Sequence, residues 1–192
     1  MNIYLTGSRA CTSYGQQMAA SIAADLVRLG HHVVTSLAHG IDTHTARAVL
    51  AACESQSAPL SIVTANGPAP TRVWPRAQAD LLDAARDAGA RILSPVANGA
   101  TPTRAVLRQV VDMCIEQADA IVVIEAGARS TARAAGELAA RRGRGVYVVP
   151  GPMTAAHSAG TLALAQAGAY PVGSARDVHT HLLQSAPTRP PR

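Results

Sequence analysis

The sequence contains no lysine and no phenylalanine, and aromatic residues make up only 3% of its 192 residues. All 17 residues counted as Lys or Arg are therefore arginines, whose planar guanidinium can donate two hydrogen bonds to one phosphate. A GC-rich genome, which favours Ala, Arg, Gly and Pro, is an alternative reason for this composition. The few aromatic rings leave few platforms on which nucleic-acid bases could stack.

Cysteine and long apolar runs are also scarce. The three cysteines, Cys11, Cys53 and Cys114, lie far apart, which argues against a disulfide framework and a zinc site and predicts a reducing, cytoplasmic compartment. No apolar run is long enough to span a bilayer, so we expect no membrane contact. The first residues lack the basic stretch that opens a signal peptide.

The charge is positive, with a formal net charge of +5 and a sequence pI of about 9.7. A basic domain predicts a polyanionic partner where its cations are clustered. Hydrophobic residues make up 48% of the chain, enough for a packed core, and the length suits one α/β domain better than two.

Apolar runs and helical spacing alternate along the chain. The pattern predicts strands over 3–6, 32–35, 60–64, 91–93, 121–124, 146–149 and 169–172. It predicts helices over 14–29, 42–52, 76–88, 102–117, 130–142, 158–166 and 175–183. The segment 121–124 is the most apolar short run, so we expect it to be the central strand.

These repeated strand–helix units predict an extended Rossmann-like α/β fold, with a mostly parallel sheet covered by helices on both faces. We expect one domain over residues 1–185 and a disordered tail rich in Pro and Arg over 186–192. Ligands of such sheets bind outside the carboxyl ends of the strands, so the loops at 7–11, 36–42, 66–74, 125–130 and 151–158 are the candidate sites.

The first two of these loops carry small and polar residues. Gly7 permits a tight turn, and Ser8 and Arg9 could bind a phosphate at the start of a helix, although an ordinary turn with a solvated arginine is equally consistent. Gly40 fits a turn, and Asp42 is expected to cap the next helix. The pair His39 and His44 lacks the Cys or carboxylate partners of a metal site, so we expect no metal.

The later loops are similarly suited to phosphate. Glu125, at a strand end, could be a general base or accept from a ribose hydroxyl, or it could simply be a polar strand exit. Ser130 is expected to cap its helix and also to contact phosphate beside Gly127 and Arg129. The prolines around Gly151 predict a rigid ligand wall. The cluster 141–144 is expected to cap a helix end and aid solubility rather than bind DNA.

Taken together and in order, these motifs resemble the DprA/Smf DNA-processing family over residues 3–178. The segments that carry the resemblance are Gly7-Ser8-Arg9, Ala38-His39-Gly40-Ile41-Asp42, Trp74-Pro75-Arg76, Ile124-Glu125-Ala126-Gly127-Ala128-Arg129-Ser130, Gly143-Arg144, Val149-Pro150-Gly151-Pro152-Met153-Thr154 and Ser158-Ala159-Gly160-Thr161. The family's amino-terminal and winged-helix modules have no counterpart in these 192 residues.

The resemblance implies single-stranded DNA binding, assistance in loading a RecA-type recombinase, a homodimer, and no catalytic reaction or cofactor. It implies a phosphate-binding set formed by Gly7, Ser8, Arg9, Ser36, His39, Gly40, Gly127, Arg129, Ser130 and Gly151. Arg104 and Arg108 are further candidates for a DNA groove. The family's Arg-Asn-Arg element reads Val110-Val111-Asp112 here, which removes two cations and adds one acid.

Two other functions remain open. Loss of the groove cations, with the loop motifs retained, also fits binding of a small nucleotide-derived ligand by a sensor or sequestering protein. An N-glycosidic hydrolase is less consistent, because that family's Gly-Gly-x-Gly-Thr-x-x-Glu loop is not matched: here Glu137 lies six residues after Thr131.

Overall fold

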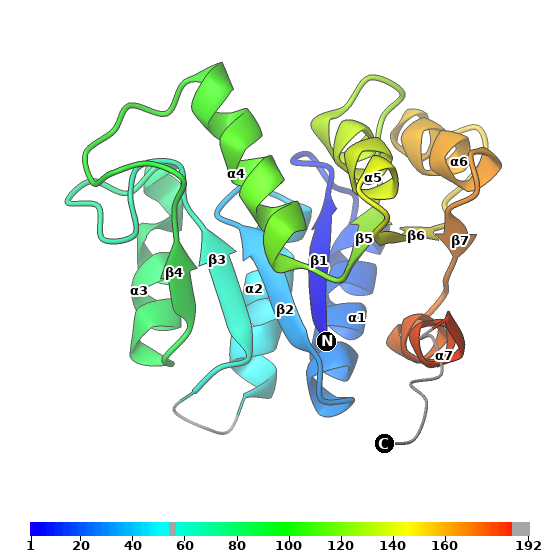
Figure 1. The fold of residues 1–192 in the computed structure, drawn as a ribbon, viewed down its shortest axis with the longest axis horizontal. Coiled ribbons are helices and arrows are strands. Elements are labelled where there is room, and N and C mark those ends of the chain that lie inside the picture. Colours follow the sequence, from blue (N-terminus) through cyan, green and yellow to red (C-terminus); the bar gives the residue numbers. More distant parts are fainter. Residues whose placement is uncertain (54–56, 186–192) are drawn as a thin grey trace, which may run out of the picture.

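The computed structural model describes residues 1–53 and 57–185, and in them seven strands form one entirely parallel sheet. The strands, in chain order, are β1 Asn2–Gly7, β2 His32–Ser36, β3 Leu60–Val63, β4 Arg91–Leu93, β5 Ala120–Ile124, β6 Gly145–Val149 and β7 Tyr170–Pro171. Their spatial order is β4-β3-β2-β1-β5-β6-β7, as Figure 1 shows. The predicted Rossmann-like α/β domain is confirmed. The predicted tail, 186–192, lies outside the described residues.

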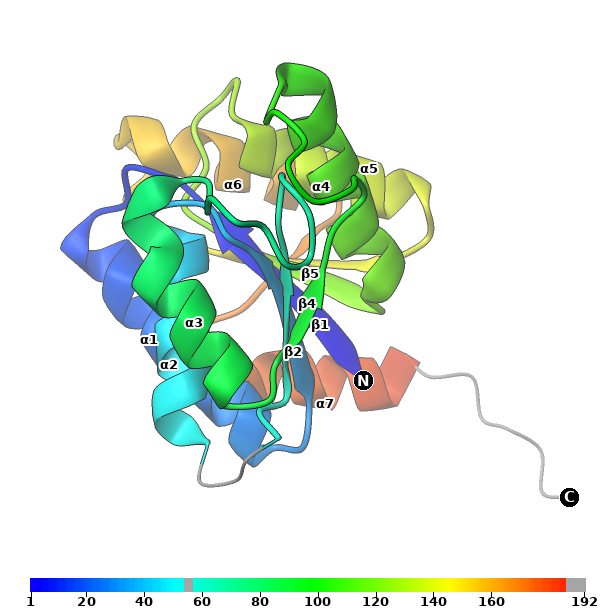
Figure 2. The ribbon, with the colours of Figure 1, turned by 90° about the vertical axis from the view of Figure 1, so that its left-hand side faces the viewer.

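Helices cover both faces of this sheet. They are α1 Ser13–Arg28, α2 Ile41–Ala52, α3 Ala79–Asp87, α4 Arg104–Gln117, α5 Thr131–Arg141, α6 Ala159–Gln166 and α7 Ala175–Ser185. Short 3-10 turns, Arg76–Gln78 and Ala156–Ser158, precede α3 and α6. Helices α1, α2, α3 and α7 pack on one face, and α4, α5 and α6 pack on the other (Figure 2). None of the helices in the described part of the chain has the length and apolar content needed to cross a membrane.

The alternation of side chains along each strand divides the core between the two faces. On β1, Ile3 and Leu5 pack with the α1 side, whereas Tyr4 packs with the α4 side. The order of the strands corrects one expectation: the middle strand is β1, and β5 lies beside it. Apolar content could not distinguish the two, because β1 and β5 are each flanked by strands and buried on both faces.

Candidate functional site

A cavity of about 620 Å³ lies at the carboxyl ends of β1 and β2, between α4 and α5. We call it the main cavity. Because all the strands are parallel, the loops that follow them meet along one edge, the upper edge in Figure 1. The residues that line it are Tyr4, Thr6, Gly7, Ser8, Arg9, Ala10, Ser36, Ala38, His39, Asp42, Trp74, Pro75, Leu107, Val110, Val111, Arg129, Ser130, Thr131, Ala132 and Ala135.

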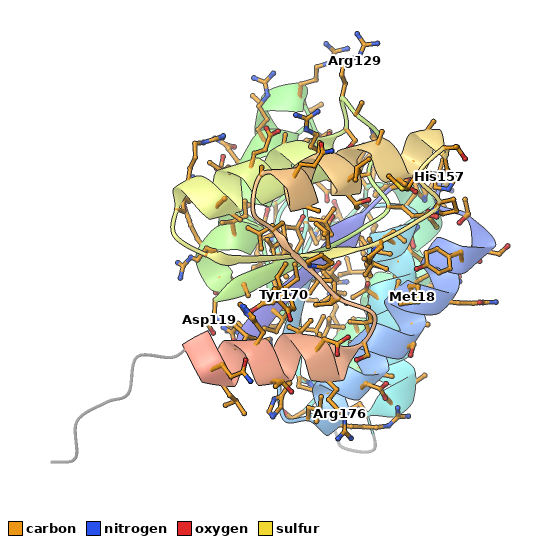
Figure 3. The ribbon with its side chains drawn as sticks, turned by 90° about the vertical axis from the view of Figure 1, so that its right-hand side faces the viewer. Met18, Asp119, Arg129, His157, Tyr170 and Arg176 are labelled. Atoms are coloured by element: carbon orange, nitrogen blue, oxygen red, sulfur yellow. The ribbon has the colours of Figure 1, made fainter. Side chains whose placement is uncertain are left out.

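Seven of the predicted phosphate-binding residues line the main cavity together: Gly7, Ser8, Arg9, Ser36, His39, Arg129 and Ser130. They come from three separate loops. Arg9 and Arg129 are exposed, and neither forms an ion pair within residues 1–53 and 57–185. Figure 3 shows Arg129 at the end of the molecule opposite Arg176. Two guanidinium groups without an ion pair in these residues therefore border one recess.

Gly40 is among the predicted residues that do not line the main cavity, but it positions the loop that does. Its φ is 74°, in the region that side chains rarely adopt. A Cβ on Gly40 would lie 2.2 Å from the carbonyl oxygen of Ser8. The amide of Ile41 donates to the same oxygen at 3.1 Å. The β1–α1 loop therefore rests directly on the backbone of the β2–α2 loop.

Asp42 does not cap α2, contrary to expectation. The cap position is Gly40, and Asp42 lies in the first turn with only 2% of its surface exposed. Its carboxylate accepts from the Thr6 hydroxyl at 2.9 Å, and from the Ser36 amide at 3.2 Å and hydroxyl. Burial raises its pKa to about 6, opposed by hydrogen bonds from Ser36, Thr6 and the Gly7 amide. Asp42 thus ties the ends of β1 and β2 together.

One wall of the main cavity is apolar. It includes Trp74 and Pro75 from the loop after β3, and Leu107, Val110 and Val111 from α4. The sequence motif Trp74-Pro75 pointed to this loop, but nothing in the sequence indicated which side of α4 faces the sheet edge. In this wall, Val110 stands where the resemblance led us to expect a cation.

The two groove candidates and the added acid lie elsewhere on α4. Arg104 and Arg108 are exposed and do not line the main cavity. Asp112 also faces away from it and pairs with Arg142, with 2.7 Å between Oδ1 and Nη2. The acid that replaces a family cation is therefore neutralised by a neighbouring arginine.

Glu125 also lies outside the main cavity. Its carboxylate, only 3% exposed, accepts from the Thr12 amide at 2.9 Å and from the Thr12 hydroxyl, at the start of α1. The imidazole of His157 lies 3.7 Å away. This placement gives Glu125 a role in holding α1, so the geometry does not favour the general-base or ribose-acceptor interpretations.

The remaining predicted residues follow β5 and β6. Ser130 caps α5 as expected, because its hydroxyl accepts from the Arg133 amide at 3.1 Å. Gly127 and Gly151 do not line the main cavity. A Cβ on Gly151 would lie 2.3 Å from the Ser158 hydroxyl, so this glycine permits close packing of two loops. Among the described residues, no three His, Cys, Asp or Glu side chains are grouped so that they could hold a metal ion.

Comparison with known proteins identifies the same family that the sequence motifs resemble. Residues 2–183 match the family of DNA recombination-mediator protein A. A Mycobacterium tuberculosis (strain H37Rv) protein that bears the name DNA processing protein DprA is 33% identical over 174 residues, which are 91% of this chain and 43% of that protein. The chain thus spans less than half the length of the curated relatives it matches.

Two solved structures have the same fold. DNA processing protein A from Streptococcus pneumoniae superposes with a TM-score of 0.84 at 27% identity, covering 93% of this chain and 60% of that one. DNA processing protein A from Helicobacter pylori gives a TM-score of 0.79 at 19% identity, covering 96% and 80%. Because the family match extends across nearly the whole chain, this protein belongs to the DNA recombination-mediator protein A (DprA) family.

Proposed function

We propose that this chain binds single-stranded DNA at the main cavity and acts in DNA processing and recombination. The observation that carries the proposal is that Arg9 and Arg129, from loops more than a hundred residues apart, border one recess without an ion pair in the described residues. Exposed guanidinium groups at such a recess suit phosphate oxygens. The relative from Helicobacter pylori has a unique single-stranded DNA binding mode.

The binding is expected to depend mainly on phosphate contacts and to have little sequence preference. Trp74 is the one aromatic side chain in the cavity lining besides the buried Tyr4, so base stacking has few platforms. We also propose that the protein performs no covalent chemistry, works as a homodimer, and assists a RecA-type recombinase in the cytoplasm. These partners follow from the family and not from a surface of this chain.

The test is fluorescence anisotropy of a labelled oligo-dT at about 50 mM and about 200 mM salt. Arg9→Ala and Arg129→Ala are each expected to weaken binding and to lower the salt slope by about 0.7, the value for one lost contact to single strands. Arg176→Ala is the matched control, because Arg176 is also exposed but lies at the opposite end of the molecule (Figure 3). Salt-independent affinity, or equal effects of all three substitutions, would contradict the proposal.

A second candidate is the binding of a nucleotide-derived small molecule. The volume of the main cavity, about 620 Å³, lies within the range of small-ligand pockets, and its α4 wall is apolar. A panel of nucleotides that raises the melting temperature, with no binding of oligo-dT, would favour this candidate. No thermal shift with any nucleotide would remove it.

A further inference from the structure

The floor of the main cavity carries a negative charge, although its mouth is positive. Asp42 lies at the ends of β1 and β2 and is almost fully buried, whereas Arg9 and Arg129 are exposed. At neutral pH the Asp42 carboxyl is ionised in most molecules, because its pKa is raised only to about 6. The charge is held in place by hydrogen bonds from Thr6 and Ser36.

The same hydrogen bonds remove donors that a phosphate would otherwise use. The amide of Gly7, the last residue of β1, donates to Asp42, as do the amide and hydroxyl of Ser36. The floor therefore presents acceptors and a carboxylate, while donors are concentrated at Ser8, Arg9 and Arg129. A phosphate bound at the mouth would face the carboxylate across the cavity.

Among the described residues that line the cavity, Asp42 is the one acidic side chain, and Arg9 and Arg129 attract a phosphate of either charge. Tyr4 and Cys114 interact electrostatically with Asp42 but stay neutral, because burial raises the pKa of both groups well above their ordinary values. His39 is the remaining titratable side chain in the lining, and its Nδ1 lies 2.9 Å from the Gln78 amide nitrogen. Arg9 and Arg129 complete the charged set of the lining.

We propose that Asp42 weakens the binding of the doubly charged phosphomonoesters of free nucleotides relative to phosphates with a single negative charge, the internal phosphodiesters of a nucleic-acid chain. The inference rests on the proposed function and specifies its ligand class. A sphere of this volume is about 10 Å across, which sets the scale of the distance between a bound phosphate and the carboxylate. At an intermediate effective dielectric, the repulsion of one additional negative charge by the carboxylate at such a distance corresponds to about fivefold in affinity.

The experiment compares two ligands that differ in one charge: thymidine 5′-monophosphate and its methyl ester, a phosphodiester. Each competes with labelled oligo-dT at about pH 8, where the monoester is a dianion, and at about pH 5, where it is mainly a monoanion. At the higher pH, Asp42→Asn is expected to raise the affinity for the monophosphate about fivefold relative to the affinity for the methyl ester, and at the lower pH it should leave this ratio unchanged. Asp177→Asn, which removes an exposed acid outside the cavity lining, should leave the ratio unchanged at both pH values.

A second measurement uses the wild-type protein, in case Asp42→Asn does not fold. The carbon-13 signal of the Asp42 carboxyl is titrated with and without each ligand. Because coupling is reciprocal, the monophosphate should raise the pKa of Asp42 more than the methyl ester does. An affinity ratio that Asp42→Asn leaves unchanged at about pH 8, competition by neither ligand, or an Asp42 pKa unchanged by both would overturn the inference.

The two proposals fail differently. If oligo-dT binds while Asp42→Asn does not change the affinity ratio of the two ligands, the DNA-binding proposal stands and the role of Asp42 is wrong. If oligo-dT does not bind, the DNA-binding proposal fails, and the carbon-13 titration still tests whether Asp42 discriminates between the two small ligands.

Discussion

Asp112 on α4 and Arg142, which follows α5, form an ion pair with 2.7 Å between Oδ1 and Nη2. The side chains are 38% and 35% exposed, and Arg142 also approaches Glu116 at 3.7 Å. The pair joins the two helices that enclose the main cavity, on the side away from its lining. The acid in the segment Val110-Val111-Asp112 therefore adds no charge to the cavity, and of the two positions at which the family has a cation, Val110 alone lines the cavity.

Adding a cation to the α4 wall of the main cavity should strengthen DNA binding. Val111→Arg places a guanidinium on the α4 side of the main cavity, where Val111 is half-buried. We expect tighter binding of oligo-dT at low salt and a salt slope steeper by about 0.7, because one more phosphate is neutralised. Thr180→Arg on α7 adds the same charge at an exposed position outside the main cavity. Equal gains from both substitutions would mean that only the net charge matters.

Gly40→Ala should impair the β1–α1 loop as well as stability. Its Cβ would meet the carbonyl oxygens of Ser8 and Arg9 at 2.2 and 2.5 Å, so the loop must move. Gly30→Ala is the matched control: its φ is 79°, but a Cβ there has no atom within 4 Å. We expect Gly30→Ala to cost about 1–2 kcal/mol of stability and to leave oligo-dT affinity unchanged. Gly40→Ala should cost more and should also weaken binding, as measured by urea unfolding and anisotropy.

Glu125→Gln should reduce stability and leave DNA binding intact. The Thr12 amide and hydroxyl both donate to the carboxylate, and a carboxamide has only one oxygen to accept them, so about 1–3 kcal/mol is expected to be lost. Glu137→Gln, at an exposed ion pair with Arg133, should cost less than about 1 kcal/mol. Release of a base from nucleoside monophosphates by the wild type, lost in Glu125→Gln, would contradict the structural role and revive the hydrolase hypothesis.

The buried carboxyl of Asp42 should make stability depend on pH. Its pKa is about 6 in the folded protein against 3.8 as the ordinary value, so between these values the folded state binds more protons than the unfolded state. The raised pKa of Asp42 therefore adds on the order of 3 kcal/mol to the free energy of unfolding at low pH. This contribution is full below the unfolded pKa and is lost as pH rises through about 6.

Urea unfolding of wild type and Asp42→Asn across this pH range isolates that effect, because the histidines are common to both proteins. Asp177→Asn serves as a control of opposite sign: hydrogen bonds from the Gly173 and Ser174 backbone and from the Ser174 side chain lower the pKa of Asp177. Its contribution is present at neutral pH and is lost as pH falls. A stability difference between wild type and Asp42→Asn that does not change with pH would show that Asp42 titrates normally.

Much of the fold could be predicted because it depends on local patterns. Alternating apolar runs and helical spacing placed every strand and helix within a few residues, and parallel strands necessarily bring their following loops to one edge. This was enough to bring Ser8, Arg9, Arg129 and Ser130 to one cavity. Ser130 also capped its helix as expected, since capping is a local interaction between a side chain and an amide three residues later.

Residues whose role depends on distant partners could not be assigned from the sequence. Asp42 sits where a capping residue is common, yet the burial of its carboxylate against Thr6 and Ser36 became visible only once β1 and β2 were adjacent. Glu125 contacts Thr12, 113 residues away, and so lies beside α1 instead of in the main cavity. The sequence determined by itself the fold class, the family and the loops that meet at one edge of the sheet. Which side chains of these loops point into the cavity was decided by the tertiary structure. A buried charged or polar group points toward the neighbour that forms its hydrogen bond, and that neighbour can be far away in the sequence.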